Sequence, residues 1–260
     1  MPINPKSMTP PIRLICAALL SLSTITTQAD TTTLGIGSDS SLGKYGQESP
    51  TRMQVHFLSL SYDSPDFTHK LVIPWLKLAG PASASGQGDL SLLPLEKEGH
   101  TQTSGLGDIL LGSTWKAWES RQQAIDLSLK LKLPTGNREQ GLSTGKPDLS
   151  ALVSAYQQWG KTNLLGTIGY KQVGKPTTGD YRNTIIGSLG MAYRLNADQQ
   201  WGFSYDWAQS ALRSQGIRRE FTIYGSQRLA AQWQLQAWLY TGFTPASPDL
   251  GGGLGLSYRF

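Results

Sequence analysis

Apolar and polar residues alternate along most of the chain after residue 30. The segment 125–133 has an apolar residue at every odd position and a polar residue at every even position. The segment 201–207 repeats this period with Trp201, Phe203 and Tyr205, and the segment 254–260 is apolar at every even position. Because a period of two places successive side chains on opposite faces of a strand, the pattern predicts half-buried β-strands.

Twelve such segments can be placed along the chain, separated by turn residues. They lie at 31–41, 51–62, 67–78, 105–118, 122–133, 148–158, 162–172, 181–194, 199–209, 217–228, 232–242 and 250–260. The connections after even-numbered strands are tight, whereas those after odd-numbered strands are mostly longer, at 42–50, 79–104, 134–147, 173–180, 210–216 and 243–249. Outer-membrane barrels have short periplasmic turns, long extracellular loops and both termini in the periplasm. We therefore predict an all-β fold, a single 12-stranded antiparallel transmembrane β-barrel.

Three irregularities qualify this pattern. The alternation breaks near Phe57 and Leu58, which predicts a β-bulge in the second strand. The loop 79–104 is the longest connection and is rich in Gly, Ser and Pro, so we expect it to be mobile or folded into the mouth. Small residues at 251–253 are expected to open the lumen or to permit a bend in the last strand.

Residues 1–29 have the features of a secretory signal peptide. Lys6 and Arg13 precede a short apolar core at 14–22, and Thr27 and Ala29 are the small residues expected before a cleavage site. The sequence thus predicts export and one barrel domain over 30–260, located in the cell outer membrane of a Gram-negative bacterium.

Cleavage of this leader changes the chemistry of the chain. Cys16 is the only cysteine, so the mature protein has no thiol and no disulfide. Loss of Lys6 and Arg13 lowers the formal net charge from +5 to +3. This small basic excess gives no ground to expect a nucleic acid as partner.

The composition excludes other classes of protein. The chain has 16% charged residues, 29 Gly, 8 Trp and 10 Tyr, with a mean hydropathy of −0.28. No uncharged apolar run reaches the roughly 18–20 residues of a membrane-spanning helix. The aromatic content is too high for a disordered chain. A polar average rich in Gly and aromatic residues is typical of a membrane barrel, whose strands face lipid on one side and whose aromatic residues mark both interfaces.

The strand period also predicts which charged residues line the lumen. A charge on the lipid face at the bilayer midplane costs about 2–4 kcal/mol, so charged residues are assigned to the inner face. Nine are basic: Lys70, Lys116, Lys130, Lys132, Lys171, Arg182, Arg194, Arg228 and Arg259. Four are acidic: Asp108, Asp126, Asp206 and Glu220. The positive balance predicts a narrow path for small polar or anionic solutes, such as organic or aromatic acids.

The alternative is that these charges pair across the lumen and plug it. Barrels of about eight strands are filled by side chains and those of sixteen to eighteen leave channels, so twelve strands leave both possibilities open.

Several short motifs resemble a family of bacterial outer-membrane proteins. These are Ser-Gly-Leu-Gly-Asp at 104–108, Leu-Pro-Thr-Gly at 133–136, Ser-Thr-Gly-Lys-Pro-Asp at 143–148, Ser-Pro-Asp at 247–249, and the last residues 257–260. This family consists of outer-membrane transporters or porins that are named after the MetA (meta-cleavage) pathway of phenol degradation. The resemblance covers most of 31–260, although Asn137 and Ser143 depart from its usual pattern. It implies an outer-membrane barrel of the transport class, and the terminal Phe260 resembles the signal read by the barrel assembly machinery.

Two glycine-rich segments superficially match nucleotide-binding loops. The segment 141–147 is one residue short of a phosphate loop, has Pro147 where Ser or Thr is needed, and no helix follows it. The segment 251–255 lies in the last strand without a βαβ unit. We interpret both as parts of the barrel and expect no cofactor.

The remaining alternatives depend on His56, His69 and His100, the only histidines. Metal binding would require them to converge with carboxylates, which the strand placement does not predict. A lipid hydrolase would use a lipid-facing Ser and His, but His69 lies on the apolar face with no serine motif beside it. We therefore predict no enzyme. A structural or adhesive barrel without flux would bind partners through the loop 79–104.

Overall fold

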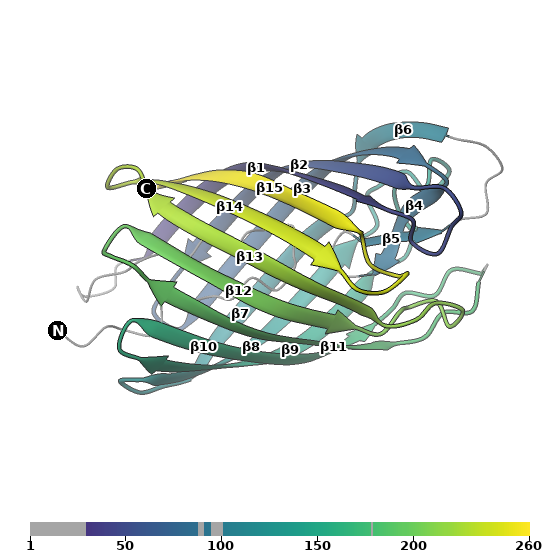
Figure 1. The fold of residues 1–260 in the computed structure, drawn as a ribbon. Helices are drawn as coiled ribbons and strands as arrows, with labels where there is room; N and C mark the ends of the chain where they lie inside the picture. Colours follow the sequence, from purple (N-terminus) through teal and green to yellow (C-terminus); the bar gives the residue numbers. More distant parts are fainter. Residues whose placement is uncertain (1–29, 88–90, 95–100, 178) are drawn as a thin grey trace.

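The computed structural model describes residues 30–87, 91–94, 101–177 and 179–260. The predicted signal peptide and His100 lie outside the described residues. In the described part of the chain, no helix is long and apolar enough to cross a membrane. The elements in these ranges are strands, and their order along the chain determines the architecture (Figure 1).

The strands of the described residues are numbered in chain order. Their bounds are β1 Thr31–Gly43, β2 Thr51–Asp63, β3 Phe67–Gly80, β4 Ala82–Gln87, β5 Ser91–Pro94, β6 Thr101–Leu106, β7 Ile109–Glu119, β8 Gln123–Leu133, β9 Asp148–Trp159, β10 Thr162–Gln172, β11 Thr184–Arg194, β12 Gln199–Ala208, β13 Arg218–Arg228, β14 Trp233–Gly242 and β15 Leu250–Arg259.

Twelve of these strands form a closed antiparallel ring. Each pairs with its neighbour in sequence order, from β1 through β2, β3 and then β7 to β15. The ring closes because β1 also pairs with β15, from Thr33 opposite Arg259 to Leu42 opposite Leu250. All backbone groups of the spanning segments can therefore be satisfied within a bilayer. The predicted 12-stranded barrel is confirmed.

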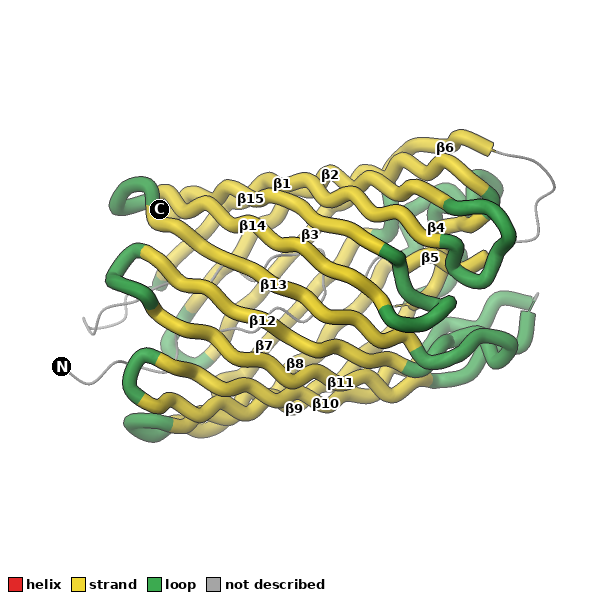
Figure 2. The backbone as a smooth tube through the Cα atoms, viewed as in Figure 1, coloured by secondary structure: helices red, strands yellow, loops and turns green. Residues whose placement is uncertain are grey.

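The two ends of the barrel differ in the length of their connections. The tight turns lie at the same end as the C-terminus, and the longer loops lie at the other end (Figures 1 and 2). Backbone hydrogen bonds close the turns, as in Ser64 N to Phe67 O at 2.8 Å and Leu229 N to Trp233 O at 2.9 Å. By the rule for outer-membrane barrels, the end with the tight turns is periplasmic and the other is extracellular.

The predicted strand 105–118 is in fact divided in two. The chain leaves the ladder at Gly107 and Asp108. As a result, β6 pairs with the half of β3 nearer the long loops, and β7 pairs with the half nearer the tight turns. Gly107 lies against the inner face of β3, where an added Cβ would be 2.9 Å from Leu76 Cδ1. A side chain at this position would separate the two segments from β3. The β4–β5 hairpin, within the loop 79–104, was not predicted by the alternation.

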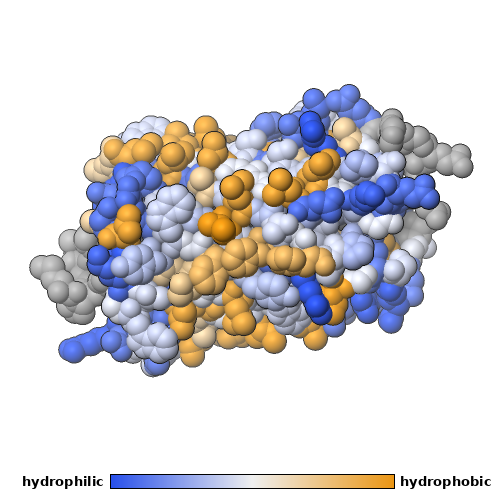
Figure 3. All heavy atoms as spheres, viewed as in Figure 1, coloured by the Kyte–Doolittle hydropathy of each residue, from blue (hydrophilic) through white to orange (hydrophobic). Residues whose placement is uncertain are grey.

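The outer face of the barrel is apolar over its middle. Leu189 and Leu239 are 65% and 67% exposed on this face. Figure 3 shows hydrophobic residues over the centre of the visible face and hydrophilic residues toward its ends. This arrangement matches a band of lipid contact between two polar rims.

The predicted bulge in β2 is wrong. The register of β2 against β1 and β3 is continuous through Phe57 and Leu58, and the two side chains point inward and outward respectively. The apparent phase break arises because the inner face of β2 is itself apolar here, with Met53, Val55 and Phe57 buried. The irregularity lies in β7 instead, where the register shifts between Lys116 and Trp118.

Candidate functional site in the barrel lumen

The predicted pore-lining residues divide between the two ends of the lumen. By strand position, Lys70, Lys116, Asp126, Arg194, Arg228 and Arg259 lie toward the periplasmic end. Asp108, Lys130, Lys132, Lys171, Asp206 and Glu220 lie toward the extracellular end. Arg182 lies in the loop before β11, where its Nε donates a hydrogen bond to Ser210 O at 2.9 Å. Lys70 and Lys130 are both register partners of Gly112, so these two lysines lie near each other between the two ends. The role of the predicted residues in conduction remains a proposal.

Four aromatic rings on the inner face lie flat along the barrel wall. We call Phe57, Tyr224, Trp238 and Tyr240 the aromatic belt. Each ring covers a glycine, and a Cβ added there would lie 2.2–2.4 Å from the ring; the pairs are Gly37 with Phe57, Gly202 with Tyr224, Gly251 with Tyr240, and Gly253 with Trp238. Because such separations are impossible for real atoms, glycine at these positions is what lets the rings run along the wall.

Asp39 holds two rings of the aromatic belt in place. Its Oδ2 accepts a hydrogen bond from Trp238 Nε1 at 2.6 Å, and its Oδ1 accepts one from Tyr240 OH at 2.6 Å. Asp39 and Trp238 are both register partners of Gly253, so the indole reaches across β15 to β1. Hydrogen bonds to a carboxylate are among the stronger ones, so Asp39 fixes both ring orientations.

The aromatic belt continues into apolar clusters around much of the inner face. Phe57 packs with Val72 and Leu110, and Tyr224 belongs to a cluster with Tyr156 and Leu165. Trp238 packs against both clusters and is the one partly exposed ring of the belt. A solute passing this level would therefore meet an aromatic surface, with Trp238 its most accessible part.

Lys132 forms the centre of a buried ionic cluster at the extracellular end. Its Nζ lies 3.1 Å from Asp108 Oδ2 and 3.2 Å from Asp148 Oδ2, and it donates to Thr144 Oγ1 at 3.3 Å. Lys132 is 7% exposed. We call Lys132, Asp108, Asp148 and Thr144 the Lys132 cluster. Since one ammonium faces two carboxylates here, Lys132 adds no free positive charge to the lumen.

The Lys132 cluster gathers the sequence motifs that carry the family resemblance. Asp108 Oδ1 accepts a hydrogen bond from Gly136 N at 3.1 Å, and Thr135 Oγ1 donates to Gly107 O at 2.8 Å. The motifs at 104–108, 133–136 and 143–148 therefore meet in space. Their residues anchor the loop that joins β8 to β9.

This loop, residues 134–147, folds back toward the inner face of the barrel. Leu142 is 2% exposed and packs in one cluster with Met53 and Leu78 of β2 and β3. Gly141 and Gly145 have φ values of 74° and 69°, which glycine adopts without strain. The loop 79–104 was expected to be mobile or folded into the mouth, and part of it lies outside the described residues. The loop 134–147 is one whose described residues pack against the inner face.

A second loop contact surrounds Tyr181 at the extracellular end. Tyr181 packs with Val173 and Ala211. Burial raises the pKa of the Tyr181 phenol, while the nearby charges of Lys132 and Arg138 oppose this shift. Tyr181 thus lies close to the Lys132 cluster, and the two loop contacts share one side of the mouth.

Three arginines lie together at the periplasmic end. Arg228 is close enough to Arg194 and to Arg259 for mutual repulsion of their charges. Asp198, in the adjacent turn, approaches Arg228 Nη1 at 3.8 Å. We call Arg194, Arg228 and Arg259 the arginine trio. Asp63 also lies close enough to Arg259 for their charges to interact, so three guanidinium groups face these two carboxylates and the balance at the periplasmic exit is positive.

Some charges on the inner face were not predicted. Asp39 and Asp148 add acidic residues, and Arg218 adds a base whose Nε lies 3.8 Å from Glu220 Oε2. The basic excess of the lumen is therefore smaller than the thirteen predicted residues implied. Asp39 was missed because the first strand has the weakest alternation, and Asp148 because it begins its strand.

Two of the three histidines, His56 and His69, lie in the described residues. His56 and His69 both lie on the outer face, and the described residues contain no group of three or more His, Cys, Asp or Glu that could hold a metal. His69 lies on the outer face as predicted, and no serine motif lies beside it in its own strand, but Ser113 of β7 is its direct register partner. The sequence around His69 could not reveal this serine, because the two residues are 44 positions apart and meet only through the pairing of β3 with β7.

The sequence comparison establishes the family of this protein. Residues 46–260 match the model of the family described as "Putative MetA-pathway of phenol degradation". The chain belongs to this family. A search of curated proteins finds no match to the sequence.

Solved structures of outer-membrane barrels are similar to the chain. The KdgM porin, solved in complex with disordered oligogalacturonate, has 8% identity and a TM-score of 0.56, covering 87% of this chain and 99% of its own. The NanC porin has 8% identity and a TM-score of 0.55, covering 86% and 98%. The translocator domain of the autotransporter NalP from Neisseria meningitidis has 9% identity and a TM-score of 0.52, covering 89% and 88%. At these identities the likeness concerns the fold, which is that of an outer-membrane β-barrel.

Proposed function

We propose that this protein is a passive outer-membrane transporter for small aromatic anions. The observation that carries the proposal is the aromatic belt, with its partly exposed Trp238, in a lumen whose periplasmic exit holds the arginine trio. Aromatic rings stack on other rings, and a positive exit attracts carboxylates. The family description and the porin-like fold support a transport role.

The proposed mechanism is diffusion, with no chemical step and no cofactor. A solute would pass the mouth beside the loop 134–147, slide along the aromatic belt and leave past the arginine trio. Asp39 is 2% exposed and both its oxygens accept hydrogen bonds from ring donors, so the rings lie between its negative charge and a passing anion and partly shield it. Selectivity would then come from ring shape at the belt and from charge at the exit.

The test is liposome swelling with solutes that vary one property at a time. Benzoate and cyclohexanecarboxylate share a carboxylate but differ in aromaticity, whereas benzoate and benzylammonium share a ring but differ in charge. We expect benzoate to enter faster than both, and Trp238→Leu to remove its advantage over cyclohexanecarboxylate. Equal rates for benzoate and benzylammonium, or no swelling above protein-free liposomes, would refute the proposal.

A further inference from the structure

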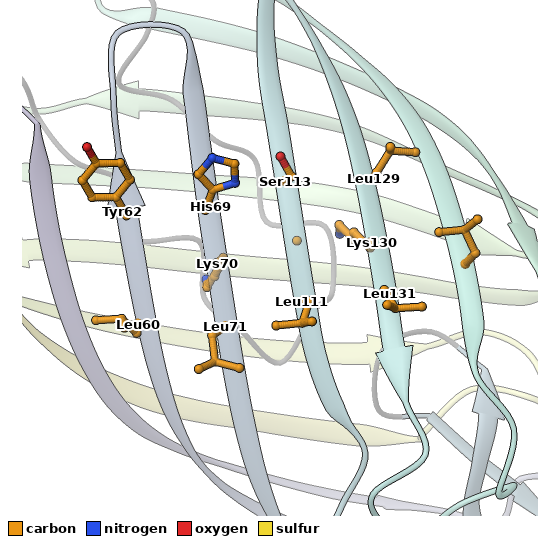
Figure 4. A pocket seen from close by; sticks show the side chains of 12 residues that line it. Leu60, Tyr62, His69, Lys70, Leu71, Leu111, Ser113, Leu129, Lys130 and Leu131 are labelled. Carbon is orange, nitrogen blue, oxygen red and sulfur yellow. The ribbon is translucent and has the colours of Figure 1, made fainter.

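The outer face of the barrel carries a groove of about 450 Å³, and the proposed solute path does not use it. This size falls within the usual range of small-ligand sites. Most of its lining is made of outer-face side chains, and Lys70, Gly112 and Lys130, which belong to the inner face, border it between them. The groove crosses β2, β3, β7, β8 and β9, and Figure 4 looks onto it. The groove forms because Ser113 has a small side chain and lies between two larger register partners, His69 and Leu129.

The groove has two rows of side chains set by the strand register. One row is wholly aliphatic and consists of Leu60, Leu71, Leu111, Leu131 and Leu149. The adjacent row carries polar groups and runs from Tyr62 through His69 and Ser113 to Leu129 (Figure 4). An amphipathic ligand would match such a surface, with its apolar part on the leucines and its polar part on the second row.

The polar row lies just inside the periplasmic aromatic girdle. Phe67 and Trp115 are register partners on the outer face, and both are exposed. On the same face and one step farther from the periplasmic end, His69 follows Phe67 in β3 and Ser113 is the neighbour of Trp115 in β7. Aromatic girdles mark the level of the lipid headgroups. His69 and Ser113 therefore lie at the depth of the glycerol esters in the periplasmic leaflet.

The polar pair needs a partner at that depth. In the described part of the chain, His69 and Ser113 form no hydrogen bond with each other or with other side chains. A polar group that faces hydrocarbon without a hydrogen bond carries a large free-energy penalty. The imidazole is already oriented by stacking on Phe67, with ring centroids 5.9 Å apart and planes 5° apart. The ester and phosphate oxygens of a lipid can accept hydrogen bonds from both side chains.

We propose that this groove binds one glycerophospholipid of the periplasmic leaflet. An acyl chain lies along the leucine row, and the ester-phosphate region accepts hydrogen bonds from His69 and Ser113. The site binds and does not cleave, because the pair has no acid to orient the imidazole and the strand N–H groups belong to the ladder and cannot stabilise an oxyanion.

Native mass spectrometry of the purified barrel with added phosphatidylethanolamine tests the proposal. We expect the wild-type protein to retain one lipid under activation that strips the rest. Ser113→Leu, which fills the groove with a lipid-compatible side chain, should lower that occupancy about tenfold. Ala155→Leu is the matched control, since it adds the same side chain to an exposed outer-face position of β9 outside the groove.

Three outcomes would overturn the proposal. The first is the absence of a retained lipid in wild type, or equal retention in Ser113→Leu. The second is equal retention of lipid A, which would remove the assignment to the periplasmic leaflet. The third is release of lysophospholipid and fatty acid, lost in Ser113→Ala, which would make the groove a hydrolytic site. None of these readouts depends on solute flux, so the proposed transport function stands or falls separately.

Discussion

At the scale of single residues, the shape of the lumen depends on where glycine replaces a side chain. Gly253 lies beneath the indole of Trp238, and a Cβ there would also lie 2.3 Å from Ser38 O. Gly255, two residues later on the same face, has its nearest neighbours at 3.7 Å. The two positions look alike in the sequence, and their different tolerance arises from the Trp238 ring and the Ser38 carbonyl, which both lie close to Gly253.

We predict that Gly253→Ala destabilises the folded barrel by about 1–3 kcal/mol, the usual cost of overpacking. Gly255→Ala should leave stability almost unchanged, because an alanine Cβ fits there. Urea unfolding in lipid vesicles measures both. Equal midpoints for the two variants would mean that Trp238 and the Ser38 carbonyl do not crowd Gly253 as described.

The residue scale is also where sequence reasoning reached its limit. The period of two could predict on which face of a strand a charged residue lies, but it could not predict the partners of that residue. Lys132 was expected to line the pore, yet two carboxylates neutralise it. The aromatic belt was missed because Trp and Tyr in a barrel are first expected at the membrane interfaces. In addition, a ring such as Trp238 of β14 crosses a glycine of β15 to reach β1, and the sequence of one strand does not show such an arrangement.

At the scale of elements, the loop 134–147 is attached to the barrel mainly by the Lys132 cluster and by Leu142. The ammonium of Lys132 lies between the two carboxylates and the Thr144 hydroxyl. Without it, Asp108 and Asp148 would face each other as buried like charges. The loop is therefore held by electrostatics at its base and by apolar packing at its tip.

We predict that Lys132→Met releases this loop and costs about 3–5 kcal/mol, the range for an uncompensated buried charge. Trypsin should then cut at Arg138 or Lys146 in intact proteoliposomes. Lys175→Met, in another extracellular loop and exposed, is the control. If Lys132→Met resists trypsin as well as wild type does, the cluster does not anchor the loop.

Strand positions could be predicted because each barrel strand has one lipid face and one lumen face. The β4–β5 hairpin could not be predicted in this way. It forms a separate sheet outside the ring, so its two faces do not divide between lipid and lumen. The break between β6 and β7 was hidden for a related reason: Gly107 and Asp108 continue the local pattern while the backbone leaves the ladder.

At the scale of the whole molecule, charge is distributed unevenly between the two mouths. The extracellular end pairs its charges in the Lys132 cluster and between Arg218 and Glu220. The periplasmic end concentrates the arginine trio. The barrel is thus electrically asymmetric, and the exit should control ion preference.

We predict that Arg194→Gln, Arg228→Gln and Arg259→Gln together lower the anion-to-cation permeability ratio by a factor of about three or more. Reversal potentials in planar bilayers under a salt gradient measure this ratio. Arg121→Gln, an exposed change in a turn at the same end, should leave it unaltered. An unchanged ratio in the triple variant would remove the arginine trio from the conduction path.

The terminal residue connects this molecule to its assembly. Phe260 is 70% exposed, and its N–H donates to Thr32 O at 2.9 Å near the beginning of β1. We propose, from its resemblance to an assembly signal, that the barrel assembly machinery reads this side chain. Its exposure on the outside of the last strand supports such recognition.

The hydrogen bonds of Asp39 have a consequence for biogenesis. They join residues separated by 199 and 201 positions in the chain, across the seam where the first strand meets the last. Contacts this remote cannot form during synthesis, when only part of the polypeptide exists. A chain that ended before residue 250 would leave β1 and β14 with open edges in hydrocarbon, where unpaired backbone is not tolerated. The seam must therefore close late, once the last strand is present, and Trp238, which bonds across it, is well placed to report this step by its fluorescence.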